Sequence, residues 1–185
     1  MSYKNENMKM IELHENGLDI QFRIRENGVV ELADFSSQEV KKAPMEPKED
    51  ICYPAVEIHR SGTGSLNMHA YKNNINQSSV DFVYENHELK EQKGGKELKI
   101  VMVSPEKLKA VYHMRLFDGV PAVQTWTEII NEGSEDQGLT YVSSFMYQGI
   151  SRGGEKPYYK KTDIYVPFNS WCCEAQWQKY DAETL

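Results

Sequence analysis

Hydrophobic and polar residues alternate along much of this chain, which is the pattern of β-strands that bury one face. The clearest example is KLKAVYHMRLFD, residues 107–118. One face of this run carries Leu108, Ala110, Tyr112, Met114 and Leu116, and the other carries Lys107, Lys109, Val111, His113 and Arg115. The run therefore predicts a long amphipathic strand. A turn at Asp118–Gly119 then leads to a returning strand over residues 123–130, so the two strands form a hairpin.

A second hairpin is predicted near the start of the chain, where the dipeptide Asn27–Gly28 separates two alternating apolar runs. This dipeptide favours a type I′ turn, which would pair residues 18–25 with residues 29–35. With further alternating runs, the count comes to about ten strands. These further runs cover residues 55–59, 66–71, 80–89, 97–103, 139–147 and 162–166. Only residues 171–185, WCCEAQWQKYDAETL, suggest a helix, and their apolar spacing is ambiguous.

Many antiparallel strands with almost no helix predict an all-β fold, a large antiparallel β-sandwich of two packed sheets. The chain has 185 residues, of which 39% are hydrophobic. That is enough for one sizeable core, and we expect a single domain over residues 1–185.

Charge and hydropathy exclude several classes of function. The 28 acidic and 21 basic residues give a net charge of -7, which repels phosphate backbones, so we expect no nucleic-acid partner. No apolar run approaches the roughly 20 residues that cross a bilayer, and residues 1–17 lack the apolar region of a signal peptide. The sequence therefore predicts a cytoplasmic protein with no membrane partner.

The cysteines and glycines do not form a recognisable cofactor motif. Cys172 and Cys173 are adjacent and Cys52 is isolated, so the sequence has no CxxC pair and no zinc-ligand spacing. The short glycine clusters at residues 62–64, 94–95 and 153–154 lack the helix that follows a phosphate-binding loop. We expect no metal and no cofactor.

Candidate catalytic and binding residues are few. The five histidines, His14, His59, His69, His87 and His113, have no serine or cysteine partner at a motif spacing. Glu128 and Glu174 lie among aromatic and apolar neighbours, where a carboxylate needs a partner. The tryptophans Trp126, Trp171 and Trp177 suit sugar binding, because an aromatic ring stacks on the C–H face of a sugar, but they suit a sandwich core equally well.

Three segments together resemble the N-terminal domain of glycoside hydrolase family 36, the α-galactosidases. The first is PAVEIHRSGTGSLNMHAYKN from Pro54. The second contains VPAVQTWTEIINEG followed by TYVSSFM, and the third is DIYVPFNSWCCEAQWQKY. The resemblance covers most of the chain, from about Leu18 to the end, and it lies in the order and spacing of the three motifs together.

The resemblance implies a β-supersandwich of the galactose-mutarotase-like type that packs on a catalytic (β/α)₈ barrel, shapes its active-site entrance and takes part in oligomer contacts. The family's catalytic aspartates belong to that barrel, which needs about 250 residues of its own and is expected C-terminal to residue 185. We therefore expect no catalytic residue and no hydrolysis from this chain alone, whereas the parent enzyme would hydrolyse terminal α-galactosides. The expected partners are the barrel, α-galactoside sugars and further copies of the chain. The expected sugar contacts are Trp171 and Trp177, with Asn169 and Glu174 as hydrogen-bonding neighbours.

Two alternatives remain open. A free-standing carbohydrate-binding module would display an exposed, coplanar pair of aromatic rings. An aldose epimerase would bring a histidine and a glutamate together in a cleft, for example His59, His69 or His113 with Glu128.

Overall fold

The computed structural model describes residues 9–39, 52–64, 77–147 and 162–181, and most of these residues lie in antiparallel strands. The prediction of an all-β antiparallel sandwich is confirmed. The chain divides into two compact units, the first formed by Met1–Gln38 with Pro47–Gln148 and the second by Glu39–Glu46 with Gly149–Leu185. The single domain over residues 1–185 stays a prediction.

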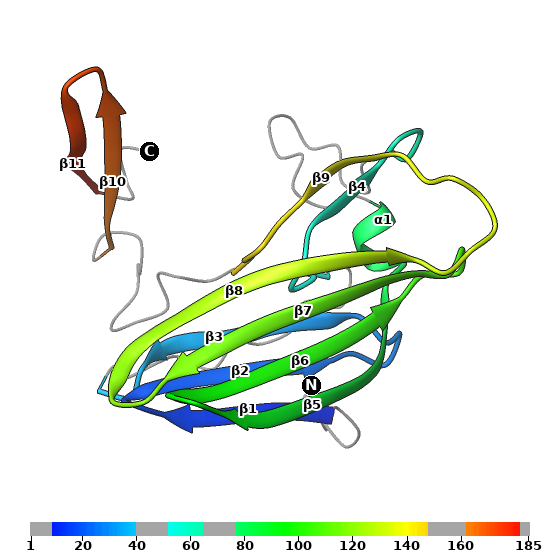
Figure 1. Ribbon diagram of the computed structural model, residues 1–185, viewed down its shortest axis with the longest axis horizontal. Helices are drawn as coiled ribbons and strands as arrows, with labels where there is room; N and C mark the ends of the chain where they lie inside the picture. The colour runs from blue at the N-terminus through cyan, green and yellow to red at the C-terminus, as the bar shows by residue number, and fades with distance from the viewer. Residues whose placement is uncertain (1–8, 40–51, 65–76, 148–161, 182–185) are drawn as a thin grey trace, which may run out of the picture. The chain divides into compact units, whose positions relative to one another are not determined.

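Two larger antiparallel sheets form most of the first unit (Figure 1). The three-stranded sheet has the order β1-β2-β3 and comprises β1 (Lys9–Glu15), β2 (Leu18–Ile24) and β3 (Val30–Ser37). The four-stranded sheet has the order β5-β6-β7-β8 and comprises β5 (Val83–Gln92), β6 (Gly95–Val103), β7 (Leu108–Phe117) and β8 (Val120–Asn131). Both sheets are meanders, because each strand pairs with the next strand along the chain.

The hydrophobic core lies between these two sheets. Phe22 of β2 and Tyr112 of β7 meet edge to face, with ring centroids 5.7 Å apart, and both side chains are fully buried. The predicted apolar face of β7 is buried along its whole length. The opposite face is not simply solvated, since Val111 and His113 are buried there too. We call this side of the β5–β8 sheet the outer face; it includes Glu97, Lys99, His113, Arg115, Gln124, Trp126 and Glu128.

The turns of the first sheet differ from the prediction. The hairpin of β2 and β3 forms as expected, but Asn27 does not adopt a positive φ, so its turn is not type I′. Instead Gly28 N–H donates to Arg25 O at 2.9 Å and Gly28 has φ 85°, which is a three-residue loop that ends in a glycine bulge. The type I′ turn lies at Asn16–Gly17, between β1 and β2, where both residues have positive φ.

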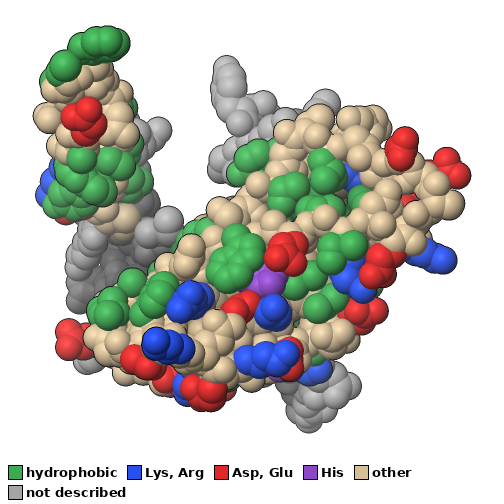
Figure 2. Space-filling view, viewed as in Figure 1, with side chains coloured by type: hydrophobic (Ala, Val, Ile, Leu, Met, Phe, Trp, Pro, Cys, Tyr) green, Lys and Arg blue, Asp and Glu red, His purple; other side chains and the backbone are tan. Residues whose placement is uncertain are grey.

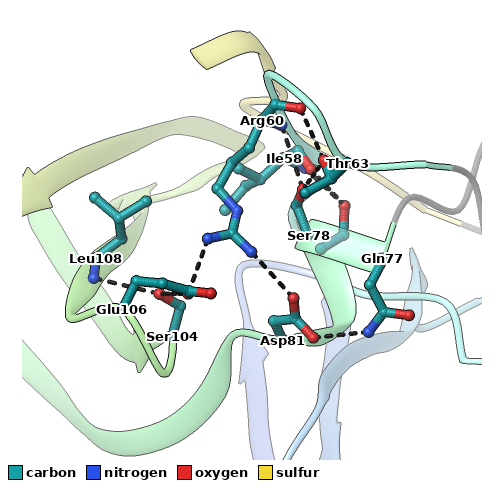
Figure 3. A network of polar contacts seen from close by, with 10 residues as sticks. Ile58, Arg60, Thr63, Gln77, Ser78, Asp81, Ser104, Glu106 and Leu108 are labelled. Atoms are coloured by element: carbon teal, nitrogen blue, oxygen red, sulfur yellow. Dashed lines mark hydrogen bonds and ion pairs between the residues drawn. The ribbon is translucent and has the colours of Figure 1, made fainter. Parts of the chain in front are cut away.

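A smaller sheet of β4 (Ile58–Arg60) and β9 (Leu139–Val142) adjoins the helix α1 (Gln77–Val80). Figure 3 shows that the buried Arg60 ties these elements to the β6–β7 turn. Its guanidinium bonds Asp81 at 3.1 Å and Glu106 at 2.8 Å. Because two carboxylates compensate the buried charge, the network has a structural explanation. The predicted strand over residues 80–89 begins later, at Val83, since residues 77–80 are helical.

The second unit contains a two-stranded hairpin of β10 (Asp163–Ser170) and β11 (Cys173–Asp181). The helix suggested by residues 171–185 was therefore wrong for residues 173–181, which form a strand. The apolar spacing did not distinguish a helix from a strand here. Backbone pairing with β10, for example of Val166 with Gln178, makes this segment a strand. The strand predicted over residues 66–71 lies outside the described residues.

Candidate functional site

The four sugar-contact residues predicted from the sequence all lie in the β10–β11 hairpin. Trp171 occupies the two-residue turn between Ser170 and Cys173 and is 94% exposed. Trp177 lies within β11 opposite Pro167 and is 64% exposed. The hairpin thus presents two indole rings to the solvent, one at its tip and one on its flank.

The polar neighbours of these tryptophans have different surroundings. The side-chain oxygen of Asn169 accepts a 2.7 Å hydrogen bond from the backbone N–H of Ala175, which adopts the left-handed conformation with φ 51°. Asn169 therefore braces the hairpin below its tip, whereas the Glu174 side chain is exposed. The structure places the four residues in one hairpin. The side-chain oxygen of Asn169 already accepts a hydrogen bond within that hairpin.

A second cluster lies on the outer face of the β5–β8 sheet. The sequence suggested only one pair of it, His113 with Glu128, as part of the epimerase alternative. His113 of β7 and Trp126 of β8 are cross-strand neighbours whose rings stack with centroids 4.5 Å apart and an angle of 10° between their planes. His113 Nδ1 lies 2.8 Å from Glu97 Oε1 of β6, and its Nε2 lies 3.4 Å from Glu128 Oε2 of β8. Figure 2 looks onto this region and shows a histidine among acidic, basic and hydrophobic side chains.

Glu97 is the electrostatic centre of this cluster. The hydrogen bond from His113 lowers the pKa of the Glu97 carboxyl, and a further bond from the Gln92 amide and the nearby Lys99 ammonium act in the same direction. Burial of Glu97 opposes them. Because an ionised carboxylate can only accept, the Nδ1–H of His113 donates this hydrogen bond. The imidazole is thereby held in one orientation beside the indole.

The contact between His113 and Glu128 bears on the epimerase alternative. That alternative requires both side chains to reach a substrate, whereas His113 is only 3% exposed and Trp126 covers one face of its ring. The two residues meet as neighbours on adjacent strands. The contact therefore has a structural explanation on the face of a sheet and does not favour an epimerase.

The remaining histidines do not assemble with one another. His59 of β4 contacts the buried Glu57 at 2.9 Å and the ring of Tyr141, with centroids 5.2 Å apart. His14 pairs with Asp19 at 2.6 Å, and His87 Nδ1 lies 2.7 Å from the Tyr84 hydroxyl. Partial burial and the charge of Lys9 lower the pKa of His87. His69 lies outside the described residues.

Cys172 and Cys173 are exposed thiols at the hairpin tip, and Cys52 is a partly exposed thiol in the first unit. Within the described ranges, no group of three or more histidine, cysteine or carboxylate side chains is arranged to hold a metal ion. In the same part of the chain, no helix is both long and apolar enough to cross a membrane.

The geometry thus offers two candidate contact regions, the exposed hairpin with Trp171 and Trp177 and the outer-face cluster around Trp126. Comparison with known proteins does not choose between them, because no protein-family model and no curated protein matches the chain.

Proposed function

We propose that this chain is the non-catalytic N-terminal β-sandwich domain of an α-galactosidase-like glycoside hydrolase. In this proposal it packs on a catalytic barrel, shapes the entrance of the active site and contributes to oligomer contacts. The order of the three sequence motifs supports the family, and the antiparallel sandwich is the fold that the resemblance implies. The parent enzyme would hydrolyse terminal α-galactosides through two barrel carboxylates.

The exposed hairpin is the single observation that carries the proposal. Trp171 and Trp177 share the hairpin with Tyr165 and Phe168, which are also exposed. A hairpin of two strands is marginally stable by itself in water, and large exposed aromatic side chains mark surfaces that another protein or a ligand covers. A neighbouring catalytic domain would provide that cover.

Hydrolysis of p-nitrophenyl α-D-galactopyranoside tests this proposal. The assay compares the purified 185-residue chain with the complete polypeptide encoded by its source reading frame. We expect the complete polypeptide to release p-nitrophenol and the chain alone to release none. Release by the chain alone would show that it is itself catalytic, and an inactive complete polypeptide would contradict the assignment to α-galactosidases.

A carbohydrate-binding module is the second candidate, and the exposure of Trp171 and Trp177 favours it. Calorimetric titration of the chain with methyl α-D-galactopyranoside measures this function directly. A binding module predicts saturable heat that the substitutions Trp171→Ser and Trp177→Ser abolish. Binding that survives both substitutions would exclude the hairpin as the sugar site.

A further inference from the structure

We propose that Trp126 forms a separate binding platform for a pyranose sugar on the outer face of the β5–β8 sheet. The platform consists of Trp126 with Gln124 and Glu128, which flank it on β8. It belongs to the first unit, whereas the β10–β11 hairpin belongs to the second. The choice of a galactoside as its ligand rests on the proposed function, whereas the existence of the platform rests on the geometry below.

The indole of Trp126 is held in place before any ligand arrives. Its ring stacks in parallel on His113, and the hydrogen bond to Glu97 fixes the orientation of His113. Lys99 and Gln92 in turn contact Glu97. Because these contacts already restrict the Trp126 side chain, stacking of a ligand on it costs little conformational entropy.

One face of this indole points away from the sheet. His113 belongs to β7 and occupies the face of Trp126 that is turned toward the sheet interior. β8 is the last strand of the described four-stranded sheet, so the second face of the ring is directed beyond the edge strand. Trp126 is partly exposed, as a stacking surface must be.

Polar side chains lie before and after Trp126 along β8. Gln124 and Glu128 lie two residues before and after Trp126, so all three side chains project from the same face of β8. Gln124 is exposed, and the Glu128 side chain is 55% exposed. An amide and a carboxylate can hydrogen-bond the hydroxyl groups at the rim of a pyranose whose C–H face covers the indole.

The charge of the cluster favours a neutral ligand. The outer face carries two carboxylates, Glu97 and Glu128, and two cations, Lys99 and Arg115, so its charges offset one another. Without an excess of positive charge, and in a chain with a net charge of -7, this surface does not favour the phosphate groups of nucleotides and sugar phosphates. A neutral sugar presents both an apolar face and hydroxyl groups, which matches an indole bordered by polar side chains.

Calorimetric titration of the 185-residue chain with methyl α-D-galactopyranoside tests the platform, supported by saturation-transfer NMR of the sugar protons. We expect Trp126→Leu to weaken binding about tenfold, as loss of a stacking contact does, and Glu128→Gln to weaken it about threefold. Glu88→Gln is the matched control, because Glu88 is a half-exposed carboxylate of β5 that is paired with Lys90. This control should leave binding unchanged.

Three results would overturn the platform. The first is the absence of saturable binding to the chain, and the second is binding that Trp126→Leu and Glu128→Gln leave unchanged. The third is binding that Trp177→Ser abolishes while Trp126→Leu and Glu128→Gln leave it intact, which would assign the sugar to the hairpin. Glu128→Gln alters an exposed side chain, so the test holds even if Trp126→Leu disturbs folding. The proposed function is tested separately, by hydrolysis with the complete polypeptide. Its failure can therefore be distinguished from failure of the sugar platform.

Discussion

The side chain of Asn16 joins the turn between β1 and β2 to Gly119 in the turn between β7 and β8. Its oxygen accepts a 2.9 Å hydrogen bond from the backbone N–H of Gly119, and its nitrogen donates to Phe117 O at 2.9 Å. Asn16 does this from a left-handed conformation with φ 52°, which asparagine tolerates better than most residues. One side chain therefore links corresponding ends of the two packed sheets.

Substitution of Asn16 separates backbone strain from these hydrogen bonds. Asn16→Gly removes both bonds but accepts the positive φ, and we expect it to lower the free energy of unfolding by about 1.5 kcal/mol. Asn16→Ala adds the strain of a left-handed alanine and should lower it by about 3 kcal/mol. Urea titrations of both variants measure the two values. Equal losses would show that backbone strain at residue 16 is negligible.

Gly94, in the turn between β5 and β6, and Gly95, the first residue of β6, should respond very differently to alanine. A Cβ added to Gly95 would lie 1.9 Å from Leu116 O, and backbone atoms cannot move aside easily. A Cβ on Gly94 would meet nothing within 4 Å, although both residues have positive φ. We expect Gly95→Ala to cost more than about 3 kcal/mol and Gly94→Ala about 1 kcal/mol. Thermal unfolding of the two variants provides the comparison, and similar melting temperatures would contradict the close approach of β6 to Leu116.

The outer-face cluster predicts a pH-dependent contribution to stability. The pKa of Glu97 is lowered in the folded chain, chiefly by the hydrogen bond from His113. The ionised Glu97 carboxylate therefore contributes its full share to the free energy of unfolding above the ordinary carboxyl pKa of 4.5. This contribution is lost as the pH falls through the lower pKa that Glu97 has in the folded chain. We expect Glu97→Gln to lower the free energy of unfolding by about 2 kcal/mol at neutral pH, and the difference from the unmodified chain to shrink in acid.

Denaturant titrations of both proteins between neutral pH and pH values below 4.5 test this expectation. Glu88→Gln serves again as the control, because Glu88 is paired with Lys90 on the exposed surface, where such pairs contribute little. A stability difference for Glu97→Gln that stays constant across the range would show that the ionisation of Glu97 is not coupled to folding.

Alternation of apolar and polar residues predicted much of the sandwich, because neighbouring side chains of a strand point to opposite faces of its sheet. The alternation in residues 107–118 identified the buried face of β7, since every apolar residue of that face enters the core. The Asn27–Gly28 dipeptide located a hairpin. Its turn type was not predictable, because Gly28 also packs against Val83, and a Cβ there would lie 2.9 Å from that side chain. Contacts with a strand far along the chain thus override the local preference.

The outer-face cluster was hidden by an irregularity in strand register. A regular hairpin about Asp118–Gly119, with Phe117 paired to Val120, would place His113 opposite Gln124. The structure has a bulge after Leu116, which pairs with Val123, so His113 lies opposite Trp126 instead. Periodicity places both residues on the outer face but cannot show which of them touch. β1 was missed because it contributes only Ile11 and Leu13 to the core, too short a pattern to distinguish.

The exposed hairpin predicts self-association of the chain. Trp171 and Trp177 present large apolar rings to water, and burying them against a second copy would be favourable. We expect light scattering to report a mass that rises with protein concentration, and the double substitution of both residues by serine to shift it toward the monomer. Leu89→Ser is the matched control, because Leu89 is an exposed apolar residue of β5 and should leave the association unchanged. A monomer mass at every concentration would show that the exposed tryptophans do not drive association between copies of the chain. An equal effect of Leu89→Ser would assign the association to another surface.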